Sequence, residues 1–66
     1  MDYQVYATRR EADAARAEMR GWYTRAVRLY WPEHPMAARG GYIWVIQCRE
    51  TRGGPVRFLR KDGYVR

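Results

Sequence analysis

The stretch Gly41–Arg49, with the sequence GYIWVIQCR, constrains the fold of this chain more than any other. It is rich in aromatic and β-branched residues, which favour a strand over a helix. Glycines precede it, and Gly53-Gly54-Pro55 follows it, so both of its ends are marked as turns. Side chains alternate along a strand, and here both faces are apolar: Tyr42, Trp44, Ile46 and Cys48 on one, Ile43 and Val45 on the other. Such a strand is typical of the centre of a sheet or of an interface.

The residues before this strand predict a strand, a helix and a second strand. Residues 2–7 alternate between apolar and polar side chains, as in a half-buried strand. Thr8 and Glu11 form a capping box that begins a helix, which we expect to run from about residue 9 to residue 20 and to end at Gly21. Residues 24–31 alternate again. Their Val27 side faces the core, and their other side, which carries Arg28 and Tyr30, is exposed.

The second half of the chain predicts a loop, a hairpin and a tail. Residues 32–41 contain two prolines, which exclude a regular helix or a central strand there. Residues 55–60 form a strand that pairs with residues 42–49, and Lys61-Asp62-Gly63 is a turn before a short last strand at 64–66. The sequence therefore predicts a single α+β domain over residues 1–66, in the order β-α-β-β-β. One helix packs on one face of a mainly antiparallel four-stranded sheet, with a loop at 32–41 and a basic hairpin and tail at 42–66.

One helix covers only one face of such a sheet, so the other face needs a second explanation. On this open face we expect Gln4, Tyr6, Arg28 and Tyr30, together with one side of the third strand and either Val56/Phe58 or Arg57/Leu59. The small helix side formed by Ala12, Ala15 and Met19 favours Ile43 and Val45 beneath the helix. Tyr42, Trp44 and Ile46 would then need a partner, a second copy of the chain or a folded-over loop to cover them.

The formal net charge of +6 lies entirely in residues 25–66, because acidic and basic side chains balance in residues 1–24. A basic surface favours nucleic acid or acidic protein partners. The alternative is a coding bias toward arginine, since Lys61 is the only lysine. No apolar run approaches the ~20 residues of a membrane span, and one cysteine fits a reducing compartment, so we expect a cytoplasmic protein without membrane contact.

Candidate catalytic residues are few. A nucleophile needs a base within hydrogen-bond reach, but Cys48 lies within an apolar strand and the only histidine, His34, lies in a proline-rich loop. The glycines at 53 and 54 join two strands, so they form a turn rather than a phosphate-binding loop. With only these two soft ligands and scattered carboxylates, the sequence predicts no metal, no cofactor and no enzymatic activity.

A binding function fits the pattern better. Rings on an open sheet face stack on bases, and guanidinium groups hold phosphates. We therefore predict a non-catalytic protein that binds nucleic acid or a nucleoprotein complex. The residues expected to make the contacts are Arg28, Tyr30, Trp44, Arg49, Arg52, Arg57, Arg60 and Lys61. The alternative is an inhibitor or adaptor of the kind that phages encode, which occludes a host protein machine by binding an acidic surface, as a monomer or a homodimer.

Overall fold

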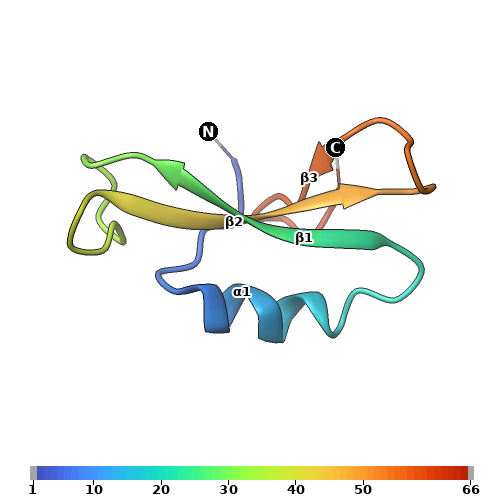
Figure 1. The fold of residues 1–66 in the computed structure, drawn as a ribbon, viewed down its shortest axis with the longest axis horizontal. Helices are drawn as coiled ribbons and strands as arrows, with labels where there is room; N and C mark the ends of the chain where they lie inside the picture. The colour runs from blue at the N-terminus through green and yellow to red at the C-terminus, as the bar shows by residue number, and fades with distance from the viewer. Residues whose placement is uncertain (1, 66) are drawn as a thin grey trace.

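A computed structural model describes residues 2–65 of the chain as one helix and one antiparallel sheet (Figure 1). Helix α1 spans Arg9–Arg16, and the strands are β1 (Tyr23–Tyr30), β2 (Tyr42–Arg49) and β3 (Arg57–Phe58). The strand order is β1-β2-β3, so β2 is central, as its two apolar faces predict. Figure 1 shows α1 lying along one face of the sheet. The result is a small α+β fold.

Strands β1 and β2 form a long antiparallel ribbon. Every residue of β1 pairs with one of β2, from Tyr23 opposite Arg49 to Tyr30 opposite Tyr42. Four side chains of β2 are completely buried: Ile43, Val45, Ile46 and Cys48. The predicted boundaries of this central strand are confirmed.

The predicted N-terminal strand is not a strand in the structure, so the sheet has three strands rather than four. Residues 2–7 make only isolated bridges, Tyr6 with Trp44 and Tyr3 with Arg60. The edge of β2 that faces away from β1 is shared: the Ile46 carbonyl accepts from Leu59, while Trp44 exchanges two hydrogen bonds with Tyr6 (2.8 and 2.9 Å). Because β3 occupies the far half of this edge, the N-terminal segment has room for only a short contact.

Helix α1 begins where the capping box predicts and ends earlier than expected. The Glu11 N–H donates to the Thr8 hydroxyl at 3.2 Å, which satisfies one of the free donors of the first turn. After Arg16 the hydrogen bonds tighten to a three-residue spacing, with the Met19 N–H donating to the Arg16 carbonyl. Gly21 then reverses the chain with a φ of +84°, as a C-terminal glycine does.

The C-terminal part is also less regular than predicted. The strand expected at 55–60 is reduced to Arg57–Phe58, followed by a bridge between Leu59 and Val65. The expected turn is present, because the Gly63 N–H donates to the Arg60 carbonyl at 3.0 Å. The last residue of the predicted strand at 64–66 lies outside the described residues.

The helix lies on the opposite face of β2 from the one predicted. Ala12 of α1 is fully buried against Ile46 and Cys48, not against Ile43 and Val45. The reason lies in β1, which places the small residues Thr24 and Ala26 beside these two, leaving room for a close helix. Arg16 fixes this arrangement by donating to the Thr24 carbonyl at 3.0 Å and its hydroxyl at 3.3 Å.

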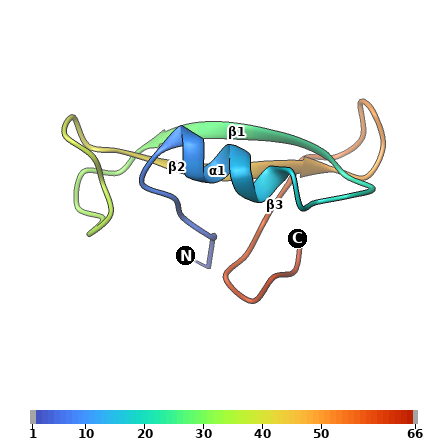
Figure 2. The same cartoon turned by 90° about the horizontal axis from the view of Figure 1, so that it is seen from below.

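Segments of the chain itself cover the other face in part. Ile43 and Val45 form a second core with Val5, and half-buried residues pack around it: Tyr3, Val27, Leu29, Trp31, Ala37 and Phe58. The folded-over segments are therefore the N-terminal residues and the loop at 32–41. The sequence instead expected such a cover over Trp44 and Ile46, the side on which α1 packs. Figure 2 shows α1 along the β1–β2 ribbon, with the segment before α1 and the segment after β3 on the same side of the ribbon.

Within residues 2–65, no helix has the length and apolar character that crossing a membrane requires.

Candidate functional site

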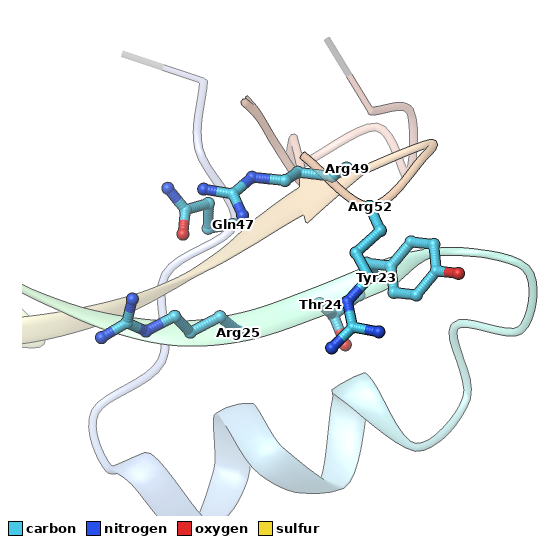
Figure 3. A pocket seen from close by; sticks show the side chains of 6 residues that line it. All are labelled: Tyr23, Thr24, Arg25, Gln47, Arg49 and Arg52. Carbon is cyan, nitrogen blue, oxygen red and sulfur yellow. The ribbon is translucent and has the colours of Figure 1, made fainter. Parts of the chain in front are cut away.

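The cover over the second face stops before the ribbon ends, and an open depression lies there. Its volume is about 290 Å³. We call it the basic depression, and it is lined by Tyr23, Thr24, Arg25, Gln47, Arg49 and Arg52 (Figure 3). Arg49 and Gln47 extend from β2, Arg25 from β1, and Arg52 from the turn between β2 and β3.

The register of the ribbon builds this site. Tyr23 pairs with Arg49 and Arg25 pairs with Gln47. Residues directly opposite in an antiparallel pair share a face, so these four side chains project from the same side of the sheet. The next pair, Val27 with Val45, belongs to the covered core on that side. One sheet face therefore changes from apolar and covered to polar and open within two residues.

The positive charges of the basic depression are not paired with carboxylates of residues 2–65. Among residues 2–65, the ion pairs join Asp13 to Arg9 (3.5 Å) and to Arg16 (2.7 Å), both on α1. None involves the three arginines of the basic depression. The Nε atom of Arg49 is buried and lacks a hydrogen-bond partner in the same described part. Three guanidinium groups without carboxylates produce a local positive potential that attracts anions.

Three of the predicted contact residues lie together elsewhere, at the far end of the ribbon and on the helix side. Arg28, Tyr30 and Trp44 are joined there by Tyr42 and Arg9. The Arg28 Cζ lies 4.3 Å from the Tyr42 ring centroid, and the Tyr30 and Tyr42 rings meet edge to face at 5.3 Å. The Arg9 Cζ lies 6.0 Å from the Trp44 ring. We call these five residues the ring cluster. Each of its rings already contacts another ring or a guanidinium group of the cluster.

The remaining predicted contacts divide between two places. Arg49 and Arg52 line the basic depression. Arg57 is exposed on β3 and Lys61 is exposed in the following turn, whereas Arg60 is half-buried with its Cζ 4.8 Å from the Tyr3 ring. The structure thus separates the eight predicted residues into three groups rather than joining them on one surface.

Sequence reasoning missed Tyr23, Arg25 and Gln47. Their signal was present in the alternation, because Arg25 follows the same side of its strand as Val27 and Leu29. An arginine in line with core residues marks the point where the cover of that face ends. Pairing this point with the polar end of Tyr42–Arg49 requires the register, which the sequence left open.

The nucleophilic and basic side chains Cys48, Tyr6 and His34 lie in packed or hydrogen-bonded surroundings. Burial raises the pKa of the Cys48 thiol, which disfavours the reactive thiolate, and burial likewise raises the pKa of the Tyr6 hydroxyl. His34 accepts a hydrogen bond at Nδ1 from the Met36 N–H (3.0 Å), and its ring lies 4.9 Å from that of Trp31. Within residues 2–65, no group of three or more His, Cys, Asp or Glu residues is placed to hold a metal ion.

Comparison of the chain with models of protein families, with curated proteins and with solved structures found no match.

Proposed function

We propose that this protein is a non-catalytic nucleic-acid-binding protein that holds phosphate groups in the basic depression. One observation carries the proposal: Arg25, Arg49 and Arg52 line the same open site, and none of them forms an ion pair within the described residues. Guanidinium groups bind phosphate oxygens through two parallel N–H donors, which favours arginine over lysine at such sites.

The charge distribution of the whole chain supports the same function. The excess of +6 lies in residues 25–66, which include the three arginines of the basic depression. Asp13 is the one acidic side chain that forms ion pairs in the described part, and it belongs to α1, on the opposite face. A polyanion that approaches the open face therefore meets cations first, which raises its association rate at low salt.

A second observation favours a protein partner as the alternative function. The Trp31 N–H bonds the Gly41 carbonyl, so alternate residues of β1 turn their backbone groups away from β2. Within residues 2–65, these groups of Ala26, Arg28 and Tyr30 make no hydrogen bond, which leaves an edge that an extended segment of another protein could join. An adaptor or inhibitor would bind there rather than in the basic depression.

The test compares two triple variants with the same net charge. R25Q/R49Q/R52Q removes the cations of the basic depression, and R10Q/R20Q/R39Q removes three exposed arginines elsewhere. Anisotropy of a labelled mixed-sequence oligonucleotide at low salt measures the affinity of each. We expect the first variant to bind at least tenfold more weakly than the second, since bonds to charged groups contribute about 1.5–3 kcal/mol each. Equal losses, or no binding by the unmodified protein, would refute the proposal.

A further inference from the structure

We infer that the basic depression takes one unpaired nucleotide, whose base stacks on Tyr23, so that the protein prefers single strands to duplexes. This inference rests on the proposed function and adds the class of nucleic acid. It follows from three features of the site: the free ring of Tyr23, the size of the basic depression and the positions of its cations.

Tyr23 carries the free ring of the site. Its side chain is 56% exposed at the start of β1. It makes no ring–ring or cation–ring contact within the described residues. The rings of Tyr30 and Tyr42, by contrast, contact each other, and the Arg28 guanidinium lies over the second of them. An incoming base gains more at Tyr23, because no existing contact must be broken there.

The basic depression has room for one nucleotide of a nucleic-acid strand. Its volume of about 290 Å³ lies just below the ~300–1,000 Å³ range of small-molecule sites. The bases of a duplex are stacked and paired, and present only their edges in the grooves. A flat, exposed ring at the border of a small depression therefore contacts the face of a base only when that base is unpaired.

The cations lie where the phosphates beside a stacked base would run. Arg49 is the cross-strand neighbour of Tyr23, and Arg52 comes from the turn above the same end of the ribbon (Figure 3). Gln47 adds an amide that donates and accepts hydrogen bonds, a group suited to the edge of a base. Rings for bases beside guanidinium groups for phosphates are the arrangement of single-strand binding sites.

The experiment measures affinities for a short labelled single strand and for the blunt duplex of the same sequence. It uses the unmodified chain, Tyr23→Ala, Tyr23→Phe and the control Tyr64→Ala, which removes another exposed tyrosine (65%). We expect tighter binding to the single strand. Tyr23→Ala should weaken that binding about 5- to 150-fold, the range for loss of one stacked base, and change duplex binding less than about twofold. Tyr23→Phe keeps the ring and should retain the affinity, and Tyr64→Ala should match the unmodified chain.

The outcomes separate the inference from the proposed function. If both nucleic acids bind equally and Tyr23→Ala changes neither affinity, the inference is overturned while the proposed function stands. If single-strand affinity falls in Tyr30→Ala and not in Tyr23→Ala, the base stacks on the ring cluster and the inference is also overturned. If neither nucleic acid binds at low salt, the proposed function itself fails. Thermal unfolding of each variant shows whether it remains folded. A variant that melts like the unmodified chain but binds more weakly has lost affinity and not its fold.

Discussion

Replacement of Ala12 by leucine tests which face of the sheet the helix covers. Ala12 is completely buried, and it packs against Ile46 and Cys48, which are also completely buried. Leucine adds three carbon atoms to a completely buried site, and overpacking of this kind costs about 1–3 kcal/mol. A chain of 66 residues has a free energy of unfolding of roughly 3–10 kcal/mol, so this loss is a large fraction of the total.

The matched control is Ala14→Leu, the same change on the exposed side of the same helix. Urea unfolding followed by tryptophan fluorescence measures both variants. Ala14→Leu should stay within about 0.5 kcal/mol of the unmodified protein. Ala12→Leu should lower the free energy of unfolding by about 1–3 kcal/mol. If Ala12→Leu is as stable as the unmodified protein, or if both variants lose the same free energy, the helix does not pack as described. The face that carries the basic depression would then be in question.

Two further predictions concern backbone strain and a buried thiol. Gly41→Ala should destabilise the protein more than Gly53→Ala. Both glycines have positive φ (+84° and +80°), but an added Cβ at Gly41 would lie 3.0 and 3.1 Å from neighbouring side-chain atoms, and at Gly53 it would meet none. Burial raises the pKa of Cys48, so its stabilising contribution is complete below the ordinary thiol pKa of about 8.5 and is lost as the pH rises towards the raised pKa.

Denaturation midpoints check both predictions. Equal midpoints for the two glycine variants would contradict the close contact at Gly41. For the thiol, the midpoint of the unmodified protein should fall more steeply between pH 7 and about 9.5 than that of Cys48→Ala, because only the unfolded chain ionises readily in this range. Identical pH profiles would contradict the burial of Cys48.

The sequence predicted the central strand and the helix start because each has a strong local signal. The apolar run Tyr42–Arg49 and the Thr8 capping box depend on neighbouring residues alone. The prediction of an N-terminal strand was wrong although residues 2–7 do alternate between apolar and polar side chains. Strand β3 pairs with the same edge of β2 and leaves room there for isolated bridges only. No local pattern reveals such competition between segments distant in the sequence.

The candidate site was only partly predictable for the same reason. Arg49 and Arg52 were expected in a basic hairpin, and they line the basic depression. Tyr23 and Arg25 join them only through the register of β1 on β2. A shift of this register by one residue would have turned both side chains to the other face of the sheet. The helix face depended on the small size of Thr24 and Ala26, a packing detail that the apolar pattern of α1 did not contain.

The salt dependence of single-strand binding tests the central claim most directly. The logarithm of the affinity should fall linearly with the logarithm of the salt concentration, with a slope of about −0.7 for each phosphate neutralised. If Arg25, Arg49 and Arg52 together neutralise the two phosphates that flank the bound nucleotide, R25Q/R49Q/R52Q should reduce the magnitude of the slope by about 1.4. The charge-matched R10Q/R20Q/R39Q should keep the slope of the unmodified protein. The same slope in both triple variants would show that phosphates are not held in the basic depression and would contradict the account.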